Sequence, residues 1–156
     1  MRRACGKSPE STPEVWPITL NNLPDNLSGY YSKNSYHPSD AEWAIHNALT
    51  LYAIHSQGTT QSPNVKGVSF GKAIGNLAKN KGDNDETIKK RFNNVVTSSD
   101  TGEISNHMRS LIQLMNAEGS IGFDYTIFAK DLYLLTNPDY RDKIFFRWGE
   151  DFFGYK

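Results

Sequence analysis

A chain of 156 residues with a single cysteine can form one domain, or two small subdomains, around a sizeable core, but no internal disulfide and no multi-cysteine zinc site. Its apolar runs are too short to span a membrane, and its basic start lacks the apolar stretch of a signal peptide, so we expect a cytoplasmic protein with no membrane partner. Its 17 basic residues balance 17 acidic ones, which by itself argues against a nucleic-acid partner.

Residues 1–38 contain five of the seven prolines and show little sustained periodicity. Prolines at this density are typical of loops and turns. We therefore expect the segment to lie across helices as an extended arm with a short helical turn. The side chains able to dock it onto a core are Val15, Trp16, Ile18, Leu20, Leu23 and Leu27.

The first helix is predicted between Ser39 and Gly58. Ser39 and Glu42 have the spacing of a capping box, in which the serine caps a backbone N–H three residues on and the glutamate reaches back. At helical spacing behind them, the face that we expect to be buried carries Ile45, Ala48, Leu49, Tyr52 and Ser56. Residues 59–68 are polar, contain a proline and a glycine, and are predicted to form a mobile loop.

The second helix is predicted between Ser69 and Gly82. Its apolar stripe consists of Phe70, Ala73, Ile74 and Leu77. Beside it runs a stripe of small residues that would let another backbone approach closely, formed by Gly71, Gly75 and Ala78. Lys72 and Lys79 are seven residues apart, so we expect them to share an outward face.

Two further helices are predicted in the middle of the chain. Asp83 or Asp85 can cap the third, whose inward residues are Ile88, Phe92, Val95 and Val96 and whose outward residues are Lys89, Lys90 and Asn93. Asp100 begins the fourth, which extends to Gly119 and buries Ile104, Met108, Leu111, Ile112 and Met115.

The last two helices complete the pattern. Asp124 caps the fifth, whose apolar side is Tyr125, Phe128, Leu132 and Leu135. Pro138 suits the first turn of the sixth, which ends at Gly154 and buries Ile144, Phe145, Trp148 and Phe152. No segment alternates like a strand for more than a few residues. The sequence therefore predicts an all-α protein, a helical bundle of five to six main helices with short connections.

The sequence offers few residues for catalysis or metal binding. The four histidines lack the spacing that puts a metal pair on one helix turn, and we interpret His46 and His55 as packed side chains with local hydrogen bonds. Residues 83–85 begin like a calcium loop, but Ile88 and Asn94 stand where such a loop needs a glycine and a glutamate. Helix capping explains these acidic residues better.

Cys5 lies beside Arg2, Arg3 and Lys7, whose charges could lower the pKa of its thiol. No histidine neighbours it in the sequence, and we interpret it as an incidental cysteine in a flexible arm. The chain has neither a phosphate-cradling glycine loop nor a Gly-x-Ser-x-Gly turn. These residues therefore give no reason to expect an enzyme, a metal or a cofactor, although they do not exclude catalysis.

The balanced total charge hides an uneven distribution. Residues 1–9, 43–82 and 87–99 contain basic residues and no acidic one, whereas residues 85–156 hold 11 acidic and 9 basic residues. A neutral protein can in this way carry a basic face, although an ordinary mixed surface is the alternative. Lysines among amides suit contacts to phosphates that are insensitive to sequence, and the amides here are Asn76, Asn80, Asn93 and Asn94.

Four stretches together show a resemblance to a known family. They are residues 2–7 (RRACGK) with 13–20 (PEVWPITL), then 48–55 (ALTLYAIH) with 67–72 (GVSFGK), then 90–92 (KRF) with 107–112 (HMRSLI), and finally 124–125 (DY), 129–132 (AKDL) and 147–153 (RWGEDFF). In this order, and over nearly the whole chain, they resemble the CasB family, the small subunit of the Cascade complex of type I-E CRISPR systems. Family members usually begin with a helical segment before the Arg-Arg motif, so we expect a truncated form or a later start.

The resemblance implies an all-α protein without catalysis, built as an N-terminal helical subdomain with its Pro-rich arm (1–82) and a C-terminal helical subdomain (83–156). It implies partners as well: the backbone subunits and the large subunit of Cascade, and a second copy of the chain. It further implies contact with crRNA-guided target DNA, at the displaced strand or the backbone of the guide–target heteroduplex. Such contacts can tip a nearly balanced strand exchange and so stabilise the R-loop.

The residues expected to contact nucleic acid are basic, and the resemblance carries most of them: Arg2, Arg3, Lys72, Lys79, Lys89, Lys90, Arg91, Arg109, Lys130 and Arg147. Structural pairing is the alternative for two of them, Arg147 with Asp151, and Lys130 with Asp131 or Asp124. A second hypothesis stays open for the whole chain, a purely architectural helical adaptor that contacts protein subunits while others hold the nucleic acid. The basic residues of 43–82 favour the first hypothesis and the zero net charge favours the second.

Overall fold

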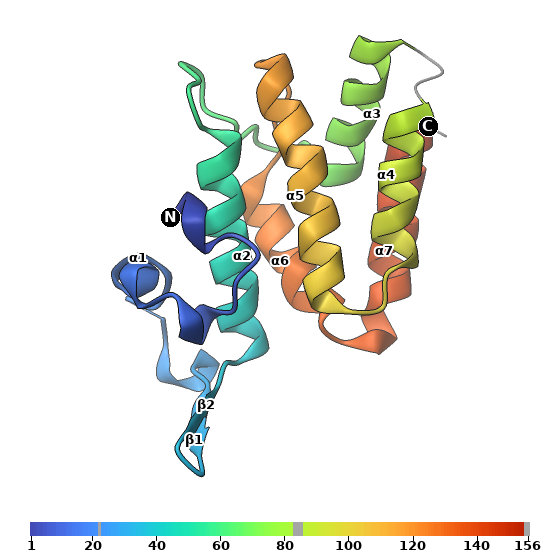
Figure 1. Ribbon diagram of the computed structural model, residues 1–156. Helices are drawn as coiled ribbons and strands as arrows, with labels where there is room; N and C mark the ends of the chain where they lie inside the picture. The colour runs from blue at the N-terminus through green and yellow to red at the C-terminus, as the bar shows by residue number, and fades with distance from the viewer. Residues whose placement is uncertain (22, 83–85, 155–156) are drawn as a thin grey trace.

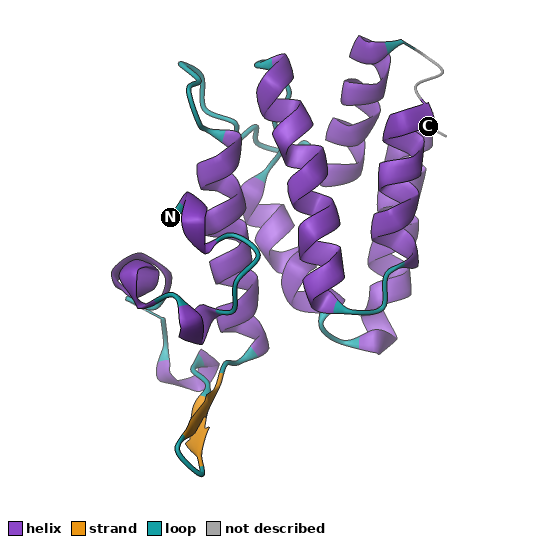
Figure 2. Ribbon diagram, in the orientation of Figure 1, coloured by secondary structure: helices purple, strands orange, loops and turns teal. Residues whose placement is uncertain are grey.

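Six long helices stand side by side, and a loop-rich N-terminal arm lies along one edge of them (Figure 1). The computed structural model describes residues 1–21, 23–82 and 86–154. Its helices in these ranges are α1 (Trp16–Thr19), α2 (Asp40–His55), α3 (Phe70–Lys81), α4 (Glu86–Thr97), α5 (Thr101–Glu118), α6 (Tyr125–Leu135) and α7 (Pro138–Phe153). Its strands are β1 (Tyr30–Ser32) and β2 (Ser35–His37), which form a small projecting hairpin (Figure 2).

The all-α prediction is confirmed, with one helix more than expected in the described part of the chain. The six predicted helices are α2 to α7, and the seventh is α1, a single turn of four residues within the arm. The hairpin was not predicted either. Each of its strands has three residues, too few for an alternating pattern to stand out in a sequence.

Helix starts follow the predicted caps. A side-chain oxygen accepts backbone N–H groups of the first turn at Ser39, Ser69, Asp100 and Asp124. The predicted caps of α4, Asp83 and Asp85, lie outside the described residues. Three helices end at predicted glycines with positive φ, namely Gly82, Gly119 and Gly154.

The capping box at α2 is only half formed. Ser39 accepts the N–H of Glu42 at 3.0 Å, as predicted. The buried carboxylate of Glu42 turns away from the helix start, because it accepts hydrogen bonds from the backbone N–H of Gly29 and the hydroxyl of Tyr36. Glu42 therefore ties the hairpin to α2 instead of closing the box.

The core follows the predicted apolar stripes in α3, α5 and α7, and in α4 and α6 with Val96 and Tyr125 only partly buried. The prediction for α2 was wrong, because its expected inward face is mostly half-buried. The buried side of α2 instead mixes apolar and polar residues: Ala44, His46, Asn47, Thr50, Leu51, Ile54 and His55. This helix packs against α5, α6 and the arm together, so hydrogen-bonded polar side chains are buried on it.

The small residues of α3 admit a close neighbour, as predicted. Helix α7 packs against α3, and a Cβ added at Gly71 would stand 2.7 Å from the Cα of Trp148. At Gly75 it would stand 3.0 Å from the carbonyl oxygen of Phe152. At Gly71 the two backbones are therefore closer than a Cβ would allow, and at Gly75 a Cβ would make a tight contact.

The arm contains more regular structure than the expected short turn. Four 3-10 turns, at Arg2–Ala4, Pro9–Ser11, Pro13–Val15 and Asp25–Leu27, accompany α1 and the hairpin. Of the six side chains expected to dock, Val15 is buried, whereas Trp16 and Ile18 are exposed. The arm is held along much of its length, since Ala4 and Cys5 are buried near its start and Thr12 and Thr19 are buried further along.

The loop of residues 59–68 was predicted to be mobile, but backbone hydrogen bonds hold it against the segment before α6. The N–H of Val65 donates to the carbonyl of Phe123 at 3.0 Å, and the N–H of Phe123 donates to the carbonyl of Pro63 at 3.0 Å. The N–H of Asp124 donates to the carbonyl of Val68 at 2.7 Å. A polar loop can be well ordered when another segment pairs with its backbone.

Helices from both predicted subdomains contact one another, with α2 against α5 and α6, and α3 against α7. The division into residues 1–82 and 83–156 stays a prediction. None of the described helices is long and apolar enough to cross a membrane.

Candidate nucleic-acid interface

The outer face of α3 brings lysines and amides together. Lys72, Asn76, Lys79 and Asn80 recur at the spacing of one helix face, and both lysines are exposed as predicted. Asn76, Lys79 and Asn80 line a surface hollow of about 330 Å³ with the segment at Ser120–Gly122. Neither lysine forms an ion pair with a described residue. We call these four residues the α3 surface.

A second basic region lies at the start of the chain. Arg2, Arg3 and Lys7 are exposed on and after the first 3-10 turn. The half-buried Arg109 of α5 reaches this region, since its Nη1 lies about 4.0 Å from where a Cβ on Gly6 would stand. The sequence alone did not predict that Arg109 lies beside the start of the chain, because the two segments are about a hundred residues apart. We call Arg2, Arg3, Lys7 and Arg109 the N-terminal surface.

The three consecutive basic residues of α4 have different surroundings. Lys90 is exposed and has no ion pair with a described residue. Lys89 pairs with Glu86 at 3.3 Å, an exposed contact that contributes little to stability. Arg91 is half-buried, and its guanidinium donates to the Ser110 hydroxyl of α5. The structure therefore leaves Lys90 the most available of the three for a phosphate.

Of the two C-terminal basic residues with a predicted acidic partner, Arg147 is ion-paired and Lys130 has no ion pair among the described residues. Arg147 pairs with Asp131 at 2.5 Å, not with Asp151, which accepts the Ser69 hydroxyl instead. Asp131 is buried and also accepts the indole N–H of Trp148 at 3.0 Å, so Arg147 serves an internal network. Lys130 is exposed and pairs with neither predicted acid in the described structure.

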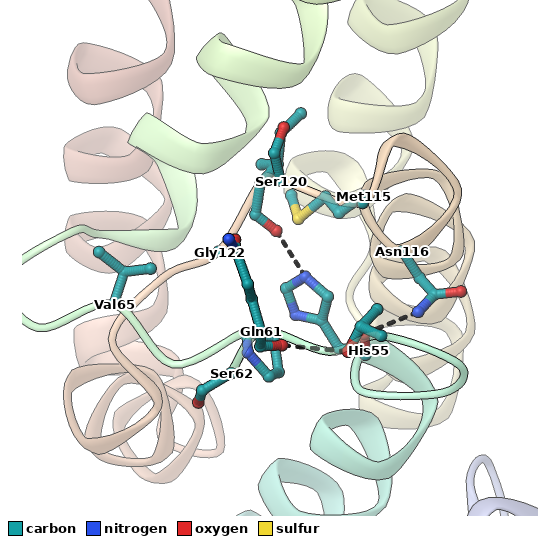
Figure 3. A pocket seen from close by; sticks show the side chains of 12 residues that line it. His55, Gln61, Ser62, Val65, Met115, Asn116, Ser120 and Gly122 are labelled. Carbon is teal, nitrogen blue, oxygen red and sulfur yellow. Dashed lines mark hydrogen bonds between the residues drawn. The ribbon is translucent and has the colours of Figure 1, made fainter.

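The two α2 histidines are packed, as predicted, but their hydrogen bonds are long-range. The Nε2 of His55 lies 2.7 Å from the Ile121 carbonyl, so it carries the proton, and Nδ1 accepts the Tyr125 hydroxyl at 2.9 Å. Figure 3 shows this ring in a small, partly open pocket that Met115 also lines. Burial lowers the pKa of His55 and raises that of Tyr125, so both are neutral near pH 7. Both ring nitrogens are satisfied, which fits a structural role.

Cys5 is buried, and the basic residues beside it in the sequence do not lower the pKa of its thiol. Burial raises the pKa of its thiol, and the nearby Arg109 opposes this shift without reversing it. His46 lies under the same arm, with Nε2 3.0 Å from the Lys7 carbonyl. Among the residues that the structure describes, no three His, Cys, Asp or Glu side chains gather as a metal ion would require.

Asp124 positions the loop at the edge of the α3 surface. Its carboxylate accepts the N–H groups of Gly67 at 2.9 Å, Thr126 at 2.9 Å and Ile127 at 3.2 Å. These bonds, the one from Gly67 first, lower the pKa of Asp124. The charged carboxylate thus ties residues 59–68 to the start of α6.

Replacing Asp124 by alanine is expected to lower the free energy of unfolding by about 1–2 kcal/mol at pH 7, because a helix cap is lost. The unfolded chain takes up a proton at this carboxylate at higher pH than the folded one, so its stabilisation is complete above about pH 4–5 and is lost as the pH falls through the lowered pKa. Urea unfolding between pH 7 and pH 3 measures the effect. The gap between wild type and Asp124→Ala should narrow on acidification, and a constant gap would contradict this account.

Fold and surfaces define the class of the protein. It is an all-α chain that presents lysine, arginine and amide side chains on its outside. The family described as CRISPR-associated protein Cse2 (CRISPR_cse2) matches residues 1–153. The chain belongs to this family, which makes it a CRISPR Cascade subunit.

Solved structures of the family have the same fold. CasB from Thermobifida fusca is 27% identical, with a TM-score of 0.74 over 97% of this chain and 80% of that one. A CRISPR-associated protein of the Cse2 family from Thermus thermophilus is 19% identical, with a TM-score of 0.71 over 98% and 82%. CasB from M. ruber is 20% identical, with a TM-score of 0.64 over 98% and 79%. No curated protein matched the sequence.

Proposed function

We propose that this chain is a non-catalytic small subunit of Cascade that binds nucleic-acid backbone without sequence preference and stabilises the R-loop in antiviral defence. Its protein partners in this proposal are the backbone subunits, the large subunit and a second copy of itself. Its nucleic-acid partner is the displaced strand or the backbone of the guide–target heteroduplex.

The observation that carries the proposal is the α3 surface. Its two lysines are exposed, have no ion pair among the described residues, and alternate with amides along one helix face. Lysines attract phosphates as point charges, and amides fix their position by hydrogen bonds. Replacing a DNA duplex by a guide–target hybrid is nearly neutral in free energy, so a few such contacts suffice to shift it. The N-terminal surface and Lys90 would add to the same field.

The architectural adaptor remains a second candidate because of one feature. Phe146 and Phe153 are 69% and 54% exposed and line an apolar hollow between α4 and α7. Exposed aromatic residues around a hollow are typical of protein contacts. This surface is compatible with nucleic-acid binding elsewhere on the molecule, so the two candidates differ in whether the isolated chain binds DNA.

The test is the salt dependence of DNA binding by the isolated chain. Removing one lysine that contacts a phosphate should flatten the plot of log affinity against log salt by about one unit, so Lys72→Ala/Lys79→Ala should flatten it by about two. The weakening should be alike for unrelated sequences, and stability should change by less than about 0.5 kcal/mol. In assembled Cascade the same variant should slow R-loop formation while guide pairing rules stay unchanged.

The matched control is Lys143→Ala, an exposed lysine on α7 outside the α3 surface and the N-terminal surface. It should leave the slope unchanged. If the double variant still binds DNA with the same slope of log affinity against log salt as the wild type, the α3 surface does not contact the phosphates. The contact would then lie on the N-terminal surface or on α4. A wild-type chain that binds no DNA at low salt would favour the adaptor.

A further inference from the structure

The β1–β2 hairpin exposes aromatic rings on both of its faces. Tyr30 pairs with His37 across the hairpin, and Tyr31 pairs with Tyr36 on the opposite face. Tyr30 is 65% exposed and Tyr31 is 79% exposed, so most of each ring is open to solvent. The rings of Tyr30 and His37 are stacked, with centroids 4.8 Å apart and planes 22° apart. The hairpin thus carries a flat aromatic pair on one face and an open tyrosine on the other.

The hairpin is held firmly at its base. The Glu42 carboxylate accepts hydrogen bonds from the Tyr36 hydroxyl and the Gly29 N–H. Burial and the contact with Glu42 raise the pKa of Tyr36 to about 12, so this hydroxyl keeps its proton. A Cβ at position 29 would stand 2.9 Å from the Tyr36 hydroxyl, so only glycine allows the close approach. The exposed rings therefore stand on an anchored support, which lowers the entropy lost on binding.

The charge of the hairpin favours a polyanion. Its two-residue turn places Lys33 and Asn34 at the tip, both with positive φ, as a type I′ turn requires. Lys33 is the one charged side chain of the strands and turn, residues 30–37, while the exposed Asp25 and Asp40 lie outside the hairpin and the buried Glu42 is occupied by it. Its strands and turn contain no aliphatic side chain, unlike the core of a protein interface.

We propose that the hairpin is a stacking platform for the unpaired bases of a single nucleic-acid strand, with Tyr30 and Tyr31 contacting bases and Lys33 a phosphate. Aromatic faces beside a positive charge are the elements with which proteins hold single strands without regard to sequence. Duplex bases are already stacked and offer no open face. The inference rests on the proposed function, since it assigns the single-stranded part of an opened DNA to this element.

The experiment measures affinity of the full chain for three probes of equal length: a mixed-sequence single strand, the same strand without bases, and a duplex. Tyr30→Ala/Tyr31→Ala should weaken single-strand binding about fivefold or more per base that loses its stacking partner. It should leave the salt slope, the base-free strand and the duplex unchanged, since no charge is removed. Lys33→Ala should flatten the single-strand slope by about 0.7.

Two controls separate stacking from other effects. Tyr31→Trp keeps an aromatic face and should retain single-strand affinity, whereas Tyr133→Ala removes an exposed tyrosine from α6 and should change nothing. Equal single-strand affinity of wild type and Tyr30→Ala/Tyr31→Ala overturns the platform, as does an equal weakening on all three probes. In either case, if Tyr30→Ala/Tyr31→Ala impairs only the assembled Cascade complex, the hairpin would instead contact another protein subunit. A wild type that binds no probe refutes the proposed function itself, whereas intact duplex binding leaves that function standing.

Discussion

Replacing Trp148 by alanine is expected to lower the free energy of unfolding by about 3–5 kcal/mol. The side chain is fully buried, and its ring lies 4.9 Å from that of Phe70 and 5.9 Å from that of Phe145, centroid to centroid. Its removal leaves a cavity at the contact of α3, α6 and α7, which rigid helices cannot close. It also takes a donor from the buried Asp131. Chemical denaturation followed by circular dichroism at 222 nm measures the change.

Trp148→Phe separates the loss of packing from the loss of the hydrogen bond to Asp131. It keeps most of the aromatic packing but removes the N–H, so we expect a smaller cost of about 1–3 kcal/mol from the weakened Asp131 network. Arg147 still pairs with Asp131 in this variant. If Trp148→Ala kept wild-type stability, Trp148 would not be a core residue, and the packing of α7 described above would be wrong.

Gly71→Ala is expected to be the next most damaging change, with a cost near or above 3 kcal/mol, the upper part of the range for overpacked cores. The added Cβ would stand 2.7 Å from the Trp148 Cα and would also meet the carbonyl oxygen of Trp148. Both are backbone atoms, so no side chain can rotate away, and α3 and α7 must separate. Thermal and urea unfolding should both show the destabilisation.

Gly149→Ala supplies the matched control on the facing helix. Gly149 lies inside α7, and apart from its chain neighbours and the backbone of its own helix no heavy atom lies within 4 Å of where its Cβ would stand. Alanine there should stabilise the protein by about 0.5–1 kcal/mol, because it favours the helix over the unfolded chain. Opposite signs for these two glycine variants are the expected result. If both were neutral, the close approach of α3 to α7 would not exist in solution.

Local patterns in the sequence were sufficient for most of the helices. The caps at Ser69, Asp100 and Asp124 and the stops at Gly82 and Gly119 depend on residues adjacent in the chain, so their chemistry can be recognised without a fold. The buried stripes of the surface helices were predictable for the same reason. Each of these helices buries one face, and apolar residues that recur at helical spacing in the sequence mark that face.

Helical periodicity did not predict the buried face of α2. It packs against several other segments, and its buried His46 and His55 are hydrogen-bonded to carbonyls that lie far away in the sequence, at Lys7 and Ile121. Its buried face therefore contains polar as well as apolar residues and forms no apolar stripe in the sequence. The hairpin escaped prediction for a related reason, since its anchor is Glu42, which local spacing assigned to a helix cap.

For the candidate interface, the sequence by itself determined which residues are basic and that Lys72 and Lys79 share a helix face. Only the tertiary structure decided which charges stay available. It engaged Arg147 with Asp131 and Arg91 with Ser110, left Lys90 exposed, and brought Arg109 to the start of the chain. The physical reason is that ion pairing and burial depend on distances between segments remote in sequence, whereas helical spacing reports only on neighbours within a few turns.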